Sequence, residues 1–150
     1  MRMIYMIWAI IIGVIIAIQA STNTALRIQL DSPWISALTN FTVGIIALLI
    51  IILIIKPETF SAMKPMFTGQ VPIWKMIGGL LGACFVVSVT ILAPHLGVGK
   101  VIILYLFGQI LMSIIIDHFG LFSMPVDKLT VQKAIGVAML IGGVILTQRK

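Results

Sequence analysis

The sequence predicts an all-α membrane protein, and three observations carry that prediction. Of its 150 residues, 61% are hydrophobic and only 9% are charged, whereas a soluble domain has about 25% charged residues. The mean hydropathy is correspondingly high, at +1.22. The apolar residues fall into five blocks, each close to the roughly 20 residues that a helix needs to cross the hydrocarbon core. This composition excludes an ordinary water-soluble enzyme and an intrinsically disordered chain.

Five transmembrane helices are therefore expected, within a single membrane domain over residues 1–150. Their expected bounds are about 3–20, with helix extending as far as 29, then 34–55, 74–93, 101–117 and 131–148. Pro33 stands at the start of the second helix and Pro57 just after its end, and both are places where proline is common. Pro94 is expected to close the third helix. The stretch 56–73, which contains three prolines and a glycine, is expected to be a surface loop.

The first apolar block has a second interpretation. Arg2 followed by an apolar run to Ala20 resembles a secretory signal peptide. However, Ile18 stands two residues before Ala20 and fits the small-x-small cleavage pattern poorly. We therefore expect this block to be a membrane helix.

Five helices would place the two termini on opposite sides of the membrane, so the cations can indicate orientation. The N-terminal side would carry Arg2, Lys56, Lys64, Lys75, Lys128 and Lys133, and the other side Arg27, Lys100, Arg149 and Lys150. Six cations against four weakly favour a cytoplasmic N-terminus. A difference this small is also expected of a protein that inserts in both orientations. Two antiparallel copies of such a chain would form the inverted architecture on which many transporters are built.

Small residues recur at helical spacing in three of the blocks, which is typical of transmembrane helices that pack closely. In the first block one occurs at every fourth position from Ala9 to Ala25. The same faces can also form the wall of a cavity. The residues expected to pack helix against helix are Ala9, Gly13, Ala17, Gly78, Gly82, Ala138 and Gly142.

Polar residues also recur four apart, so that each set shares one helical face. These sets are Gln19, Asn23 and Arg27; Ser36, Asn40 and Gly44; and Tyr105, Gln109, Ser113 and Asp117. Polar side chains kept in hydrocarbon usually face protein or water. Interhelical hydrogen bonding explains the amides equally well, and snorkelling or helix-end capping explains Arg27 and Asp117. Because three helices each present a polar edge, together they could line one water-accessible cavity.

Other kinds of site find no support in the sequence. The Gly99-Lys100 step lacks the first glycine and the Ser or Thr of a phosphate-binding loop. His95 and His118 belong to no metal-ligand cluster, and Cys84, the only cysteine, is expected to be buried and inert. The ten cations stand singly rather than on one basic face, so no nucleic-acid partner is expected. We expect no enzyme activity, no metal and no cofactor.

Several short segments stand in a characteristic order, namely 71–74 (VPIW), 78–83 (GGLLGA), 93–97 (APHLG), Gly108-Gln109 and 116–120 (IDHFG), preceded by Gln19-x-x-x-Asn23. In this order the chain resembles the YdcZ family of inner-membrane exporters, within the drug/metabolite transporter (DMT) superfamily, over essentially its whole length. Ile73 departs from the family pattern, which has a second tryptophan there. The resemblance implies a multi-pass protein of the bacterial inner (cytoplasmic) membrane that exports small molecules. It also implies assembly with a second copy or a paralogue into an antiparallel, ten-helix dimer.

We therefore expect a secondary transporter that works by alternating access in this inverted dimer. Its small-molecule substrate would be bound near the midplane by the side chains of Gln19, Asn23, Asn40, Tyr105, Gln109 and Trp34. Asp117 is the only acid near a predicted helix, so proton coupling is assigned to it, and Arg27 to coupling or gating. Relatives that exchange protons for cationic drugs have a carboxylate in the first helix, and its absence here argues against that mechanism.

Two other functions remain open at this point. The polar faces could line the pore of a dimeric ion channel. The chain could also be a membrane subunit that works only with a different partner chain. Slow, saturable flux in liposomes indicates a carrier and rapid, unsaturated current a channel, whereas an inactive homomer indicates a subunit.

Overall fold

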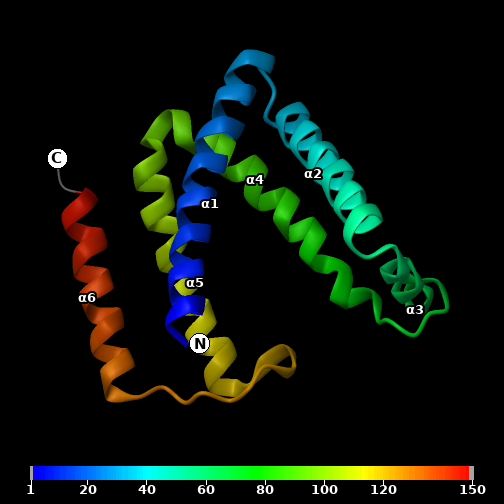
Figure 1. The fold of residues 1–150 in the computed structure, drawn as a ribbon. Coiled ribbons are helices and arrows are strands. Elements are labelled where there is room, and N and C mark those ends of the chain that lie inside the picture. The colour runs from blue at the N-terminus through cyan, green and yellow to red at the C-terminus, as the bar shows by residue number, and fades with distance from the viewer. Residues whose placement is uncertain (1, 149–150) are drawn as a thin grey trace. The chain divides into compact units, whose positions relative to one another are not determined.

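The computed structural model describes residues 2–148, and every regular element in that range is a helix (Figure 1). The α-helices are α1 (Arg2–Leu30), α2 (Pro33–Ile55), α3 (Lys64–Phe67), α4 (Ile77–Leu96), α5 (Val98–Phe119) and α6 (Val131–Gln148). Short 3-10 turns join them: η1 (Pro57–Met63), η2 (Ile73–Met76) and η3 (Leu121–Ser123). The all-α prediction is thus confirmed for these residues. Arg149 and Lys150, two of the cations used to assess orientation, lie outside the described range.

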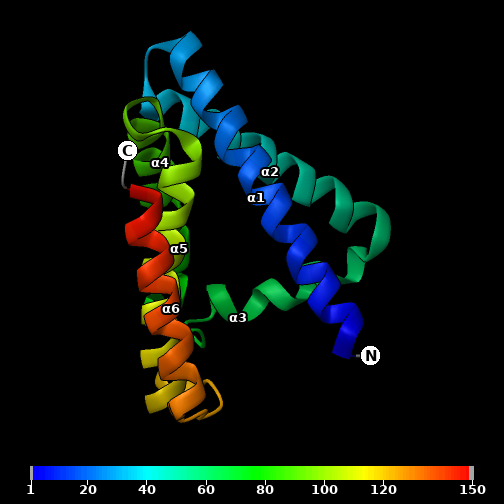
Figure 2. The ribbon, with the colours of Figure 1, turned by 90° about the vertical axis from the view of Figure 1, so that its left-hand side faces the viewer.

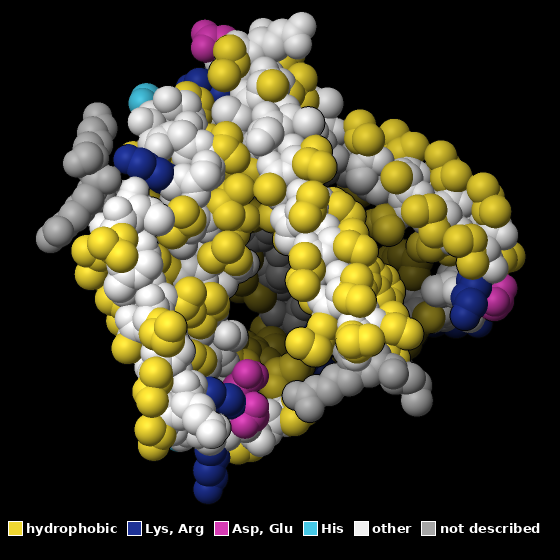
Figure 3. All heavy atoms as spheres, turned by 60° about the vertical axis from the view of Figure 1, so that its left-hand side comes forward, with side chains coloured by type: hydrophobic (Ala, Val, Ile, Leu, Met, Phe, Trp, Pro, Cys, Tyr) yellow, Lys and Arg dark blue, Asp and Glu magenta, His cyan; other side chains and the backbone are white. Residues whose placement is uncertain are grey.

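Four helices are long and apolar enough to cross a membrane, namely Met3–Leu30, Pro33–Ile55, Ile73–Leu96 and Val98–Phe119. The fifth, α6, is shorter. Its 18 residues rise about 27 Å, close to the roughly 30 Å of the hydrocarbon core. Figure 3 shows hydrophobic side chains along the helices and charged side chains near the helix ends. This distribution is that of a multi-pass membrane protein with four strong spans and a shorter fifth.

The chain forms two compact units, Met1–Pro94 and His95–Lys150. The first contains α1, α2, the short helical turns that follow α2, and nearly all of α4. The second contains α5 and α6.

Within the first unit, α1 and α2 form a tight hairpin (Figures 1 and 2). The predicted extension of the first helix is confirmed, because α1 continues without a break to Leu30. Asp31 turns the chain with a positive φ of 49°. The hydroxyl of Ser32 then accepts a hydrogen bond of 3.3 Å from the amide of Ile35, and Pro33 occupies the first turn of α2. A capping serine followed by proline is a favoured helix start.

The predicted end of the third helix is wrong. Pro94 lies inside α4, which continues to Leu96. Proline costs a helix one backbone hydrogen bond, but this one lies so near the end that only its last residues follow it. Gly97, with a φ of 84°, ends the helix instead. The start also differs, because the single 3-10 turn of η2 precedes the α-helical part.

The connection over residues 56–73, predicted as a surface loop, contains short helices. Most of it consists of short helical turns, η1 and α3. Prolines stand in the first turns of both elements, where their missing amide costs no helical hydrogen bond. The side chains of η1 and α3 are largely exposed, which agrees with the predicted surface position.

In the second unit, α5 packs beside α6. It extends beyond its predicted bounds of 101–117 at both ends, because the flanking residues that permit a turn are Gly97 and Gly120. Gly120 ends α5 with a φ of 61°. The amide of Asp127 then donates a 2.9 Å hydrogen bond to the carbonyl of Asp117, which holds the following loop against the end of α5.

Candidate substrate site

The α1–α2 hairpin is joined by a buried hydrogen bond. The hydroxyl of Ser36 donates to the main-chain oxygen of Asn23 over 3.0 Å. Ser36 is 0% exposed and Asn23 7% exposed. Asn23 and Ser36 therefore face one another, which brings together the polar faces predicted for the first two helices.

A cavity of about 280 Å³ lies beside this contact, within the first unit. Three of its lining residues are the predicted substrate-binding amides Gln19, Asn23 and Asn40. The remaining lining residues, Phe41, Gly44, Ile45, Leu48 and Val86, are apolar and come from α2 and α4. The cavity thus combines three amide groups with an apolar wall and has no charged lining residue.

Two side-chain nitrogen atoms of the first unit are buried without a hydrogen-bond partner among the described residues. They are Nδ2 of Asn40 and Nε of Arg27. Arg27 is half-buried and follows Asn23 by four residues, so it lies one turn farther along the same face of α1. Buried donors are normally satisfied, so Nδ2 of Asn40, which lines the cavity, marks a place where a hydrogen-bond acceptor would be accommodated. Arg27 lines none of the three cavities.

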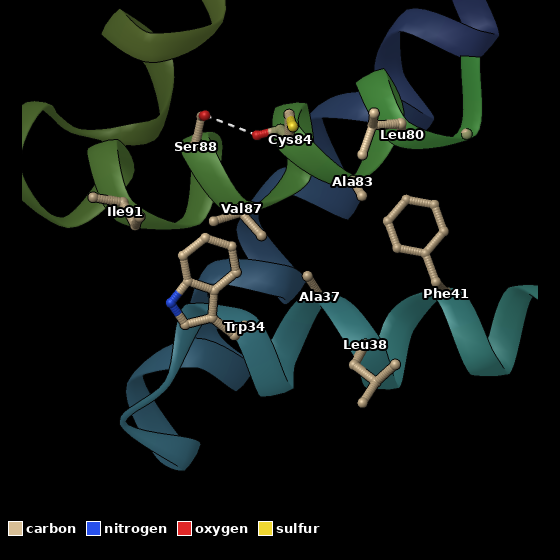
Figure 4. Close-up of a pocket in the computed structure, with 11 residues that line it drawn as sticks. Trp34, Ala37, Leu38, Phe41, Leu80, Ala83, Cys84, Val87, Ser88 and Ile91 are labelled. Atoms are coloured by element: carbon tan, nitrogen blue, oxygen red, sulfur yellow. Dashed lines mark hydrogen bonds between the residues drawn. The ribbon is translucent and has the colours of Figure 1, made fainter. Parts of the chain in front are cut away.

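Trp34 does not line the cavity that contains Gln19, Asn23 and Asn40. It lines a larger cavity, of about 630 Å³, between α2 and α4. Figure 4 shows the rings of Trp34 and Phe41 on either side of Ala37, directed toward Val87 and Ala83. Phe41 lines this cavity and the amide cavity alike. The structure therefore does not bring Trp34 to the same cavity as Gln19, Asn23 and Asn40.

Cys84 also lines the α2–α4 cavity, and the expectation that it is buried is wrong. It is exposed on the single chain, because the cavity separates α4 from α2 at this level. The only hydrogen bond drawn in Figure 4 runs from the Ser88 hydroxyl to the carbonyl of Cys84, over 2.7 Å. That bond stays within α4 and does not involve the thiol.

The remaining predicted site residues belong to the second unit. Tyr105 and Asp117 are half-buried and Gln109 is exposed, all on α5. The cavity of this unit, of about 410 Å³, lies between α5 and α6 and is almost wholly apolar. None of Tyr105, Gln109 and Asp117 lines it. Asp117 stands in the last turn of α5, as its sequence position suggested.

The predicted packing residues mostly face open space in the single chain. Within the described structure, a Cβ added at Gly13, Gly78 or Gly142 would meet no atom within 4 Å. Gly82 is different, because its Cβ would lie 3.7 Å from the Phe41 ring. Of the alanines, Ala9 and Ala138 are exposed and Ala17 is half-buried. Most of these small-residue faces are therefore free to receive a second chain or lipid.

The apolar wall of the amide cavity was not predicted. Phe41, Leu48 and Val86 belong to uniformly apolar blocks, in which nothing distinguishes a cavity-lining residue from a lipid-facing one. Gly44 is an exception, because it continues the Ser36–Asn40 spacing and does line the cavity. Among the residues that the structure describes, no group of three or more His, Cys, Asp or Glu could hold a metal ion.

The chain matches over residues 4–146 the model of a family described as "Putative inner membrane exporter, YdcZ". No curated protein and no solved structure matches it. The family is one of transporters rather than enzymes, and its location agrees with the apolar helices. Because the match covers nearly the whole sequence, the chain belongs to the YdcZ family of inner-membrane exporters.

Proposed function

We propose that the protein exports a small organic molecule by alternating access, as one half of an inverted dimer, and that the amide cavity binds the substrate. The observation that carries this proposal is the convergence of Gln19, Asn23 and Asn40 on one cavity, where Nδ2 of Asn40 is buried without a hydrogen-bond partner among the described residues. An amide can both donate and accept hydrogen bonds. Three of them beside an apolar wall suit a substrate with a polar end and an apolar body.

Three features support the inverted dimer. Five helices leave the termini on opposite sides of the membrane, so only an inverted second copy supplies the opposite half. The small-residue positions Gly13, Gly78 and Gly142 have open space beside them, which suits close approach of another helix. The cations divide almost evenly between the two sides, as expected when both orientations are populated. Tyr105 and Gln109 would then complete the site from a helix of either copy.

The site is tested by binding and transport in the purified protein. A thermal-stability screen in detergent identifies a stabilising compound, and proteoliposomes measure its counterflow. The variants Gln19→Ala and Asn23→Ala should each weaken binding by about tenfold, the effect of losing one good hydrogen bond. Gln29→Ala is the matched control, because Gln29 is an exposed amide on the same helix and lines none of the three cavities. If both cavity variants transport like wild type, the proposed pocket is wrong.

The same proteoliposomes distinguish a carrier from a channel. A carrier gives slow, saturable exchange, and rapid unsaturated current would overturn the transporter proposal. An inactive homomer that gains activity only with a paralogous chain would replace the homodimer by a heterodimer.

Orientation is tested by cysteine labelling in cells. Gln70→Cys, in a Cys84→Ser background, places the only thiol in the exposed connection between α3 and η2. If the chain inserts both ways, an impermeant maleimide added outside should label about half of the molecules. Complete labelling or complete protection would exclude an antiparallel homodimer.

A further inference from the structure

We propose that Phe41 limits the length of the substrate, and that the substrate is an uncharged molecule with a hydrogen-bond acceptor bound at Asn40 and a short apolar end that reaches Phe41. This inference rests on the proposed function and names its substrate class. It is carried by the place of Phe41 between two cavities of the first unit, by the unsatisfied amide of Asn40, and by the uncharged lining of the amide cavity.

Phe41 is shared by two cavities. Among the described residues it is the only one that lines both the amide cavity, of about 280 Å³, and the α2–α4 cavity, of about 630 Å³. The amide cavity includes Gln19 and Asn23 of α1, whereas the described lining of the α2–α4 cavity comes from α2 and α4 alone. Phe41 therefore stands where the polar space beside α1 meets the apolar space between α2 and α4.

The ring of Phe41 reaches from α2 toward α4. Figure 4 shows it directed toward Ala83, and a Cβ added at Gly82 would lie 3.7 Å from the ring. Val86 follows Gly82 by four residues, so it lies on the same face of α4, and it lines the amide cavity. Ala83 and Val87 line the α2–α4 cavity instead. The ring thus meets α4 between the residues of one cavity and those of the other, and it separates the two.

The polar end of the substrate is defined by Asn40, which lines the amide cavity. Its Nδ2 is a buried N–H donor without an acceptor among the described residues. A buried donor without an acceptor is unfavourable, and a carbonyl or hydroxyl oxygen of the substrate would satisfy it. An ammonium group has no lone pair to offer and would leave it unpaired.

The lining of the amide cavity favours an uncharged molecule. No described residue that lines it is charged. A carboxylate or an ammonium group placed there would lose its hydration without gaining a counter-charge, which is unfavourable. A neutral carboxamide loses less, and its NH2 group can donate to the side-chain oxygens of Gln19 and Asn23.

The apolar end of the substrate would lie along Ile45, Leu48 and Val86. The cavity of about 280 Å³ is at the lower limit of drug-sized pockets, and the Phe41 ring closes it on the side of the α2–α4 cavity. The apolar end is therefore short. Removing the ring would join the amide cavity to the larger α2–α4 cavity and admit a longer substrate.

Primary carboxamides of increasing chain length test this limit, namely butanamide, hexanamide, octanamide and decanamide. Their Kd values follow from the concentration dependence of the apparent Tm in detergent, and partitioning into the detergent is the same for every variant. In the wild-type protein, affinity should stop rising once the chain reaches Phe41. In Phe41→Ala, each methylene group that enters the α2–α4 cavity should tighten binding by up to about fourfold.

The ratio of decanamide affinity to butanamide affinity should therefore rise at least about tenfold in Phe41→Ala. Phe41→Leu leaves a smaller side chain between the cavities and should give an intermediate ratio. The ratio compares two probes on the same protein, so a loss of stability in either variant does not change it. Phe60→Ala is the control and should keep the wild-type ratio, because Phe60 is 37% exposed, as Phe41 is, and lines none of the three cavities.

Cys84 reports where the apolar end lies. It is the only cysteine, it is exposed on the single chain, and it lines the α2–α4 cavity. Saturating decanamide should slow the alkylation of Cys84 by N-ethylmaleimide severalfold in Phe41→Ala and leave it unchanged in the wild-type protein. Adding Asn40→Ala to Phe41→Ala should remove this protection, because the polar end is then no longer held.

Hexanamide, hexanoate and hexylamine compare a neutral group, an anion and a cation on the same chain length. Hexanamide should raise the apparent Tm of the wild-type protein, and the two ions should leave it unchanged. Asn40→Ala should weaken hexanamide binding by about 3- to 10-fold, the effect of losing one hydrogen bond.

Each outcome decides between the two proposals. If Asn40→Ala weakens carboxamide binding but Phe41→Ala changes neither the affinity ratio nor the protection of Cys84, the amide site stands and the length limit at Phe41 falls. If hexanoate or hexylamine binds better than hexanamide, or if no carboxamide binds, the uncharged class falls. If a probe binds but neither Asn40→Ala nor Gln19→Ala affects its binding, the cavity itself is wrong and the proposed function fails with it.

Discussion

The Ser36 hydroxyl and the main-chain oxygen of Asn23 form a 3.0 Å hydrogen bond across the α1–α2 hairpin. The Ser36 residue is completely buried. It fixes the register of the two helices, because the next turn of α2 then places Asn40 at the cavity that Gln19 and Asn23 line. The geometry of the candidate site consequently depends on how the two helices meet at this pair of residues.

Replacing Ser36 tests this dependence. Ser36→Ala removes the donor without leaving a buried group unpaired, so it should cost about 0.5–1.5 kcal/mol of stability. Ser36→Leu forces a large side chain into a site that has no exposed surface and should cost about 1–3 kcal/mol. The measurement is the apparent Tm in detergent.

The matched control is Ser21→Ala, because Ser21 is exposed on α1 and bonds only to the carbonyl of Ala17 in its own helix. Its Tm should stay within about 1 °C of wild type. A Ser36→Leu protein as stable as wild type would show that the helices do not meet at this residue.

Gly120 is the second position at which a small change should have a large effect. Its φ of 61° is left-handed, and an added Cβ would lie 2.7 Å from Cγ2 of Val126 and 3.3 Å from the carbonyl oxygen of Met124. Gly120→Ala should therefore lower the free energy of unfolding by at least about 1–2 kcal/mol, the cost of a left-handed conformation for alanine. The apparent Tm should fall by about 3–8 °C.

Gly136→Ala provides the contrast, because a Cβ there meets no atom within 4 Å among the described residues. Gly136 lies inside α6, where alanine is the better helix former by up to about 1 kcal/mol. Equal effects of the two substitutions would contradict the left-handed turn at the end of α5.

His118 connects the end of α5 to the following loop. Its Nδ1 accepts a 3.1 Å hydrogen bond from the amide of Leu129, which leaves the ring proton on Nε2. His118→Ala removes this acceptor, so the Leu129 amide should exchange its hydrogen about 3- to 10-fold faster. Hydrogen-exchange mass spectrometry of the segment 121–130 measures the change. His95→Ala, at an exposed histidine in the last turn of α4, should leave this segment unchanged, and an equal effect of the two would exclude the proposed contact.

The positions of the helices were predictable from the sequence because composition alone determines where hydrocarbon can surround a chain. The observed start of α2 lies within one residue of its predicted start, since a serine cap and a proline both act locally. The end of α4 could not be predicted in this way, because the effect of Pro94 depends on how much helix follows it. The rule that proline ends a helix ignores that a last turn has few hydrogen bonds left to lose.

The candidate site was predictable only in part, for a related reason. Four-residue spacing places Gln19 with Asn23, and Ser36 with Asn40, on single faces, but it does not say which faces meet. The Ser36–Asn23 contact brings these two faces together, whereas Trp34 turns toward a different cavity. Phe41 and Val86 could not be singled out, since their neighbours in the sequence are equally apolar.

Asp117 provides the last prediction, which concerns energy coupling. It is a half-buried carboxylate at the end of α5, and α1, α2 and α4 contain no acidic residue at all. If proton movement drives export, Asp117 is the group that takes up and releases the proton, so Asp117→Asn should abolish the uptake that a pH gradient drives. Counterflow without a gradient should persist, because the amide cavity remains intact. Asp127→Asn is the control, since Asp127 is exposed and pairs with Lys133. Undiminished gradient-driven uptake by the Asp117→Asn protein would exclude Asp117 from coupling and leave export to be driven by the substrate gradient or another ion.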